Sequence, residues 1–230
     1  LNIITTTLAN FQYARQWGSQ KVFVEAQEAS RDRLVIAQVV HDGDWDPTPH
    51  ALPNLMKLIQ SQTTLNVQFK REVVNLGDVD VFKNPVLYMT GLRDFKLSEG
   101  DAERLRKYLT SGGVLIADAA AGSRSFDVAF RREFHRVLGE ELTVLDPTSE
   151  VFQTPHRISG VHYTPLVQAK NQINAPLLEG AIIDGHLAII YSPLSLSNGW
   201  EQLGFAYNRG YSDGDALRLG VNIFAYALMH

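Results

Sequence analysis

The segment from Gly112 to Gly122 constrains the fold of this chain more than any other part of the sequence. It opens with two glycines, which commonly end a helix because glycine readily adopts the left-handed conformation. The apolar run Val114–Ala117 follows, then Asp118 and several small residues, and a helical pattern opens at Ser125. A short apolar run between two helices predicts a central strand of a parallel sheet, with Asp118 at its carboxyl end.

Two further runs have the composition of strands that are buried on both faces. Leu34–Val40 is nearly continuous in β-branched and other apolar residues, and Pro85–Gly91 ends in a turn glycine. A helical pattern with Leu55, Leu58 and Ile59 on one face comes between them. Strands that alternate with helices predict a parallel sheet with right-handed crossover connections.

The two helices around the central strand carry clear end signals. Ser98 followed by Asp101 has the spacing of a capping box, and Gly112 provides the stop of that helix. The next helix is predicted from Ser125 to Leu138, with Gly139 after its last turn. Its buried side is predicted to consist of Phe126, Phe130, Phe134 and Val137.

The second half of the chain predicts a long excursion, a hairpin and a closing helix. Residues 140–176 are rich in Pro, Thr and His and show little periodicity, so we expect a loop over the edge of the sheet. Asp184-Gly185 between two apolar runs is a strong hairpin signal. Ala216–Leu228 has the pattern of a closing helix.

The amino-terminal part is harder to interpret. We expect residues 1–33 to form an extension packed on the main domain, with an edge strand at Val22–Val24, and residues 34–230 to form a single α/β domain. A short strand is also expected at Leu65–Phe69.

Composition excludes several classes of function. The formal net charge of −4 argues against nucleic acid as a partner, because a nucleic-acid-binding surface needs a basic stripe. The chain has no cysteine, which excludes disulfides, thiolate nucleophiles and thiol metal sites. No apolar run reaches membrane-spanning length. Because the chain begins with Leu1, we expect a mature or trimmed, exported bacterial protein of the periplasm, with a cytoplasmic location as the alternative.

The carboxyl ends of the predicted strands define a candidate ligand-binding rim, since ligands of open parallel sheets bind in the crevice beyond those ends. Three strand ends are expected to converge there, at His41-Asp42, Thr90-Gly91 and Asp118-Ala119. The predicted rim consists of His41, Asp42, Asp44, Trp45, Thr90, Gly91, Arg93, Asp118 and Arg124.

Asp118 is the strongest single candidate on this rim. A carboxylate at a central strand end can hold a metal, accept from a sugar hydroxyl or act as a base. The structural alternative, which is about equally frequent, is that it accepts backbone N–H groups nearby.

Asp42, Asp44 and Asp46 are spaced like oxygen ligands, but they lack the glycine and distant glutamate of a calcium loop, so solvated turn residues are the favoured interpretation. Trp45 can stack on a sugar or cover the sheet end.

Arginine and histidine side chains supply the remaining candidates. Arg93 and Arg124 follow strand ends and are suited to hold a carboxylate or phosphate, whereas mid-helix Arg131 is expected in a surface ion pair. His156 and His162 in the long excursion have no metal-ligand spacing and are expected to be solvated. The sequence contains no glycine-rich phosphate loop and no nucleophile-elbow motif, and it predicts neither a metal nor a cofactor.

Spaced blocks of the sequence resemble the DUF4159 family, whose function is unassigned. The blocks, which follow the family's order over roughly residues 33–230, are Leu34–Leu55 with its Asp44-Trp45, Pro85–Gly91, Leu105–Asp118 and Leu219–Ile223. The resemblance implies a flavodoxin-like, three-layer α/β sandwich with a mostly parallel sheet, related to class I glutamine amidotransferases, to which the hairpin would be an insertion. Many family members carry Asp-Asp at the central strand end, where this chain has Asp118-Ala119.

The amidotransferase comparison predicts a scaffold without its nucleophile. Those enzymes place a cysteine at a tight strand-to-helix turn, and the matching turn here holds Asp118-Ala119-Ala120. We therefore expect a non-catalytic binding or assembly module that takes an unidentified protein partner or small ligand. The alternative is a divergent hydrolase or carbohydrate-binding protein that uses Asp118 with His41 or Asp44, with a divalent metal as a possible aid.

Overall fold

The computed structural model describes residues 36–62, 71–170 and 174–229, and within them a seven-stranded sheet forms the centre of the molecule. The order across the sheet is β2-β1-β3-β4-β7-β6-β5. The first five strands of this order run parallel to their neighbours, whereas β6 pairs antiparallel with both β7 and β5. The strands are β1 (Ile36–Val39), β2 (Glu72–Val74), β3 (Val86–Gly91), β4 (Val114–Ala119), β5 (Thr143–Val144), β6 (Glu179–Ile183) and β7 (His186–Ser192).

The described helices connect and cover these strands. The α-helices are α2 (Ala51–Gln62), α3 (Glu99–Thr110), α4 (Arg124–Leu138), α5 (Pro165–Gln168), α6 (Ser197–Glu201) and α7 (Asp213–Met229). Three short 3-10 helices complete the set: η1 (Val79–Lys83), η2 (Ala120–Gly122) and η3 (Glu150–Phe152).

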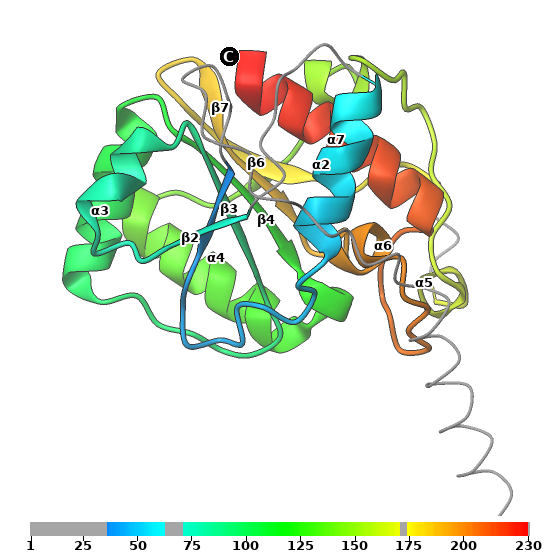
Figure 1. The fold of residues 1–230 in the computed structure, drawn as a ribbon, viewed down its shortest axis with the longest axis horizontal. Coiled ribbons are helices and arrows are strands. Elements are labelled where there is room, and N and C mark those ends of the chain that lie inside the picture. The colour runs from blue at the N-terminus through cyan, green and yellow to red at the C-terminus, as the bar shows by residue number, and fades with distance from the viewer. Residues whose placement is uncertain (1–35, 63–70, 171–173, 230) are drawn as a thin grey trace, which may run out of the picture.

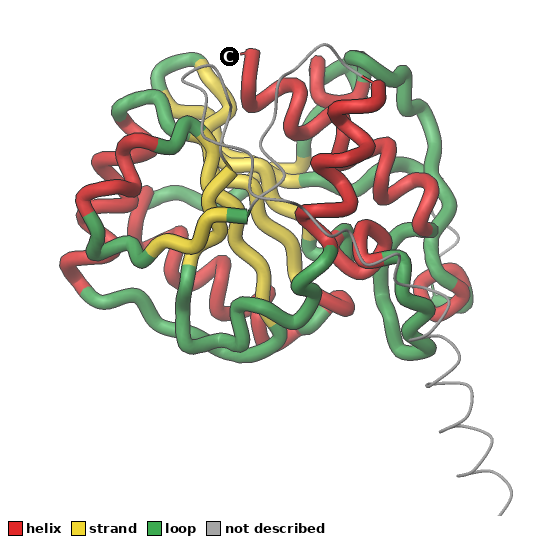
Figure 2. The backbone as a smooth tube through the Cα atoms, in the orientation of Figure 1, coloured by secondary structure: helices red, strands yellow, loops and turns green. Residues whose placement is uncertain are grey.

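The helices form a layer on each side of the sheet. In Figure 1, α3 and α4 lie on one side of the strands, and α2, α6 and α7 lie on the other; Figure 2 shows the strands between them. Alternate side chains of each strand enter opposite cores, as the strand period of two requires. Tyr88 and Ile116 pack with α2 and α7, whereas Leu87 and Leu115 pack with α3 and α4.

The central position predicted for residues 114–117 is confirmed. β4 pairs in parallel with β3 on one side and with β7 on the other, and all six of its residues are buried. The α/β class and the mostly parallel sheet are therefore confirmed, and the arrangement is compatible with a flavodoxin-like sandwich. The relation to amidotransferases stays a prediction.

The predicted helix ends are close to those observed. Ser98 caps α3 by accepting from the N–H of Asp101 at 3.1 Å, and its own hydroxyl donates to the Asp101 carboxylate at 2.6 Å. Gly112 has a φ of +95°, as expected for the residue that ends α3. The next helix, α4, begins at Arg124, one residue before the predicted start, because Ser123 is its N-cap.

The predicted hairpin is present, with Asp184-Gly185 as its two-residue turn. Both turn residues have positive φ, which matches the right-handed twist of the flanking strands. The hairpin belongs to the main sheet, because β7 is the parallel neighbour of β4 and β6 continues the sheet beyond it. Its description as an insertion into an ancestral fold stays a prediction.

The excursion at residues 140–176 differs from the expected loop over the sheet edge. Only β5 lies at that edge, and the segment around η3 packs against α7 instead. Val151, Phe152 and Ile158 are buried in the core shared with α7. Periodicity could not find this arrangement, since these apolar residues belong to short turns without a regular spacing.

Some expectations fall outside the described residues. They are the extension at residues 1–33, its edge strand at Val22–Val24, and the strand at Leu65–Phe69. Among the described helices, none has the length and apolar character needed to cross a membrane.

Asn222 joins the excursion to α7 and provides a test of this packing. Its amide nitrogen donates to the carbonyls of Val151 (2.9 Å) and His156 (2.7 Å), and its amide oxygen accepts from the N–H of His156 (2.9 Å). The Asn222→Leu variant has a similar volume but leaves these backbone groups without partners. We expect it to lower the free energy of unfolding by about 2–4 kcal/mol in urea denaturation.

The matched control for this variant is Arg157→Gln, which changes an exposed side chain in the same segment. Its free energy of unfolding is expected to stay within about 0.5 kcal/mol of the original protein. An Asn222→Leu variant as stable as this control would contradict the role of Asn222.

Candidate functional site

The three predicted strand ends do converge at one edge of the sheet. Thr90 lies opposite Asp118 in the register of β3 and β4, and the ring nitrogen Nε2 of His41, just after β1, lies 2.9 Å from the carbonyl oxygen of Thr90. The Thr90 hydroxyl also donates to the Asp118 carbonyl at 3.0 Å. Residues that are far apart in the sequence therefore share this edge.

The Asp118 carboxylate is fully buried and points toward α6. Its Oδ2 atom accepts from the backbone N–H groups of Leu196 and Ser197, both at 2.9 Å, and from the Ser197 hydroxyl at 2.8 Å. Its Oδ1 atom accepts from the Tyr88 hydroxyl at 2.8 Å. These donors satisfy both oxygens, as a carboxylate removed from water requires.

A buried polar network surrounds this carboxylate. Burial, together with the negative charge of Asp118, raises the pKa of the Tyr88 hydroxyl well above its usual value, so Tyr88 acts as a donor. The Asn198 amide oxygen accepts from the Ser195 hydroxyl at 2.8 Å and from the N–H of Ala121 at 2.7 Å. The network thus links the turn after β4 to the segment after β7.

Both ring nitrogens of His41 are hydrogen-bonded within the protein. Its Nδ1 accepts from the N–H of Gly43 at 3.0 Å, which leaves Nε2 as the protonated nitrogen that donates to the Thr90 carbonyl. Its ring packs on Phe95 and Phe126, with centroids 4.8 and 5.7 Å away. Burial lowers the pKa of His41, which favours this neutral form.

Close packing explains the glycine at the end of β3. A Cβ atom on Gly91 would lie 2.7 Å from the Phe126 ring, 2.8 Å from the Gly43 carbonyl oxygen and 2.8 Å from the His41 ring. Gly91 therefore permits the strand ends to approach one another, and its place on the predicted rim is structural.

The acidic turn after β1 divides into exposed and paired residues. Asp42 and Asp44 are exposed, whereas Asp46 forms a bidentate ion pair with Arg71. The Arg71 guanidinium also lies over the Trp45 ring, 5.5 Å from its centroid. Within the described parts of the chain, no group of three or more metal-ligating side chains is placed to hold an ion.

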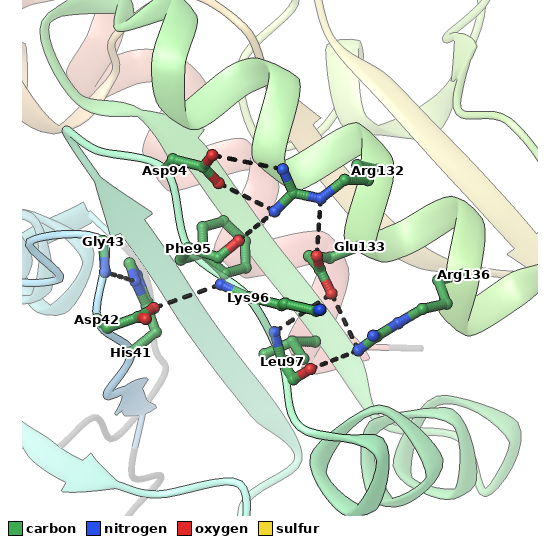
Figure 3. A network of polar contacts seen from close by, with 10 residues as sticks. All are labelled: His41, Asp42, Gly43, Asp94, Phe95, Lys96, Leu97, Arg132, Glu133 and Arg136. Carbon is green, nitrogen blue, oxygen red and sulfur yellow. Dashed lines mark hydrogen bonds and ion pairs between the residues drawn. The ribbon is translucent and has the colours of Figure 1, made fainter.

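The loop that carries Arg93 is anchored on both sides. The N–H of Arg93 donates to the Gly43 carbonyl at 2.9 Å. Figure 3 shows the other anchor, where Glu133 and Arg136 of α4 bind the N–H and the carbonyl of Leu97, at 3.2 and 2.6 Å. Arg132 adds a pair with Asp94 at 2.9 Å. The sequence analysis missed this network, although the Arg-Arg-Glu run was a signal for it.

Arg93 and Arg124 are exposed, and neither side chain bonds to another described residue. The two segments that carry them are joined, because the Ser123 hydroxyl donates to the Leu92 carbonyl at 2.6 Å. Arg209, which the sequence did not single out, donates its N–H to the Ala121 carbonyl at 3.1 Å. Among the described residues, its exposed side chain bonds only to the Gly122 carbonyl, at 3.5 Å. Three arginines that pair with no carboxylate of the described residues therefore lie on the segments around the end of β4.

The third arginine considered for this rim, Arg131, is already paired with carboxylates. Arg131 forms a bidentate pair with Glu179, at 2.6 and 2.9 Å, and a pair with Asp127 at 3.0 Å, as expected for a mid-helix arginine. These bonds and the nearby charges raise its pKa further above the usual value.

The two histidines of the excursion both bond to residues of α7. His162 is exposed, as expected, but its Nδ1 is 3.0 Å from a buried oxygen of Asp215 in α7. His156 is partly buried, and its pKa is lowered by this burial and by the charge of Arg218.

Ala121 occupies the sharp turn between β4 and α4. Its φ of +51° is uncommon for a residue other than glycine. Sequence reasoning placed this turn at residues 118–120, one to three residues too early. The side chain at its strained position is a methyl group, and Arg209 covers the adjacent Gly122.

Glu201 at the end of α6 is a further group that the sequence did not reveal. Its side chain is almost fully buried, and one carboxylate oxygen accepts from the N–H of His50 at 2.8 Å. It thereby caps the start of α2 from another element. Burial raises its pKa to about 7, with an added effect from Asp46 and opposing effects from the His50 and Ala51 N–H groups and from Arg71.

Comparison with known proteins gives one family. Residues 35–228 match the model of the domain of unknown function DUF4159. The match covers most of the chain, so the chain belongs to this family. No curated protein matches it.

The Asp118 network makes a direct prediction. In the Asp118→Asn variant an amide nitrogen replaces one oxygen, so hydrogen-bond donors face each other in a buried site. We expect the free energy of unfolding to fall by at least about 2 kcal/mol, and amide exchange at Leu196 and Ser197 to accelerate. Asp42→Asn, on the turn after β1, is the exposed control and should change neither quantity. Equal stability of the two variants would refute a structural role for Asp118.

The raised pKa of Glu201 predicts how the free energy of unfolding depends on pH. Its pKa is about 7 in the folded protein, against an ordinary value of 4.5. Folding therefore favours the protonated form, and the stabilisation is present below pH 4.5 and is lost as the pH rises through about 7. We expect the Glu201→Gln variant to lack this loss, which can reach about 3 kcal/mol in urea titrations between pH 4.5 and 8.

The control for this titration is Glu140→Gln, which alters an exposed glutamate. It should keep the pH profile of the original protein. A Glu201→Gln profile parallel to that of the original protein would contradict a raised pKa at Glu201.

Proposed function

We propose that this member of the DUF4159 family is a non-catalytic binding module that holds an anionic ligand at the carboxyl ends of β3 and β4. The observation that carries the proposal is a contrast within one rim. The acid and the histidine that would do chemistry are bonded inside the protein, whereas Arg93 and Arg124 are exposed and their side chains bond to no described residue.

The bonds made by Asp118 and His41 support a non-catalytic role. A general base needs a free lone pair within reach of a substrate proton. The Asp118 oxygens accept from Tyr88, Leu196 and Ser197, and both His41 nitrogens are bonded. The alternative in which Asp118 acts with His41 or Asp44 through a metal gains no support from this arrangement.

The turn after β4 supports the same view. On an amidotransferase-like scaffold, this strand-to-helix turn is where the nucleophile would stand. Here the left-handed residue is Ala121, and its N–H is bound by the Asn198 side chain. A methyl group supplies neither a nucleophile nor a proton donor.

The exposed arginines Arg93 and Arg124 support anion binding. An arginine guanidinium presents several donors in a planar fork that matches carboxylate and phosphate oxygens. Arg93 and Arg124 stand on segments joined by the bond between Ser123 and Leu92, and Arg209 lies against Gly122 nearby. By contrast, Arg71, Arg131 and Arg132 are all paired with carboxylates.

The proposal predicts weak, salt-sensitive binding of small anions. Malonate, citrate and inorganic phosphate are the probes, titrated at low ionic strength by calorimetry and by amide chemical shifts. The double variant Arg93→Gln/Arg124→Gln is expected to weaken the binding of the best probe at least about tenfold, as the loss of two charge-assisted contacts implies. The affected shifts should lie at residues 91–93 and 121–125.

Arg157→Gln is the matched control, because Arg157 is exposed, its side chain bonds to no described residue, and it lies in the segment beside α7. It should leave the affinity unchanged. Failure of all three anions to bind, or an equal loss in the Arg157→Gln variant, would refute a specific anion site.

A further inference from the structure

An exposed pair of aromatic rings stands beside the arginines of the rim. Phe205 and Tyr207 are 51% and 75% exposed, and their rings meet edge to face with centroids 6.1 Å apart. The backbone just before them also faces open space, since a Cβ atom on Gly204 would meet no atom within 4 Å. Large aromatic side chains exposed in this way commonly mark a binding surface.

Backbone bonds place this turn at the arginine rim. The N–H of Asn208 donates to the Phe205 carbonyl at 3.0 Å and closes the turn. The next residue, Arg209, is bonded to the Ala121 carbonyl, three residues before Arg124. The turn of the aromatic pair is therefore joined through Arg209 to the segment after β4 that leads to Arg124.

We infer that the anionic ligand of this rim is an acidic saccharide, a sugar chain that bears carboxylate groups. The inference rests on the proposed function and adds the chemical class of the ligand. The guanidinium groups of Arg93, Arg124 and Arg209 bind the carboxylates, and the rings of Phe205 and Tyr207 pack against the apolar C–H faces of the sugar rings. Tyr207 also brings a hydroxyl that can exchange hydrogen bonds with the sugar.

The position of the surface favours a saccharide over an acidic peptide. A peptide that binds by strand addition needs a free sheet edge. This rim lies at the ends of the strands, where β3 and β4 are already flanked on both sides by β1 and β7. A sugar chain needs no such edge, because it is held by side chains alone.

Trp45, the aromatic residue that the sequence suggested for sugar stacking, already has an arginine over its ring. The Arg71 guanidinium lies over its ring and is held there by Asp46 and by the Gln38 side chain. Phe205 and Tyr207 are more exposed than Trp45, so they are the better candidates for ring contacts with a sugar.

The test compares four probes on the full chain: an oligomer of galacturonic acid, the neutral galactose oligomer of equal length, a polyglutamate peptide and citrate. We expect the acidic oligomer to bind about tenfold more tightly than citrate, because ring contacts add to the carboxylate contacts. The Tyr207→Ala variant should lose this gain while keeping its affinity for citrate. Phe82→Ala, an exposed aromatic elsewhere on the surface, is the matched control and should change neither affinity.

Each other result has a defined meaning. An acidic oligomer that binds no better than citrate overturns the saccharide assignment and leaves the anion site standing. Polyglutamate that binds as tightly as the acidic oligomer replaces the saccharide with an acidic peptide. A neutral oligomer that binds equally well removes the requirement for carboxylates. If no probe binds at all, the anion site itself fails. Because Tyr207 and Phe82 are both exposed, the Tyr207→Ala and Phe82→Ala variants are expected to show unchanged secondary structure by circular dichroism.

Discussion

The buried carboxylate of Asp118 is the constraint on which the rest of the structure depends. A carboxylate removed from water needs several hydrogen-bond donors, and none of its donors comes from its own strand. Tyr88 supplies one from β3, and Leu196 and Ser197 supply the others from the start of α6. One side chain thereby sets the position of α6 on the sheet, and α6 in turn brings Glu201 to the start of α2.

This constraint also determines which part of the rim is open. With α6 held over Asp118, the polar groups on that face of the sheet bond to one another. The exposed charged groups beyond the strands include Arg93 before α3, Arg124 at the start of α4 and Arg209 after α6, together with the acids Asp42 and Asp44 after β1. Recognition by charged side chains, as we propose, fits this division better than chemistry at the strand ends.

Much of the fold could be predicted because its signals are local. The strands at 36–39, 86–91 and 114–119, the Ser98 cap and the Asp184-Gly185 turn each depend on a few adjacent residues. The candidate site was harder, because its contacts join distant segments. Asp118 stood out in the sequence, but two of its partners lie 78 and 79 residues away in an irregular loop. No periodic pattern connects Glu201 with His50, or Arg209 with Ala121.

The same distant contacts give the proposed surface its rigidity. An arginine contributes more to binding when its backbone is already ordered, because less conformational entropy is lost when the ligand arrives. The loop of Arg93 is held between Gly43 and the α4 residues Glu133 and Arg136, and Arg209 is bonded to the turn at Ala121. Glu133 and Arg136 thus support the proposed recognition indirectly, since they hold in place the loop that carries Arg93.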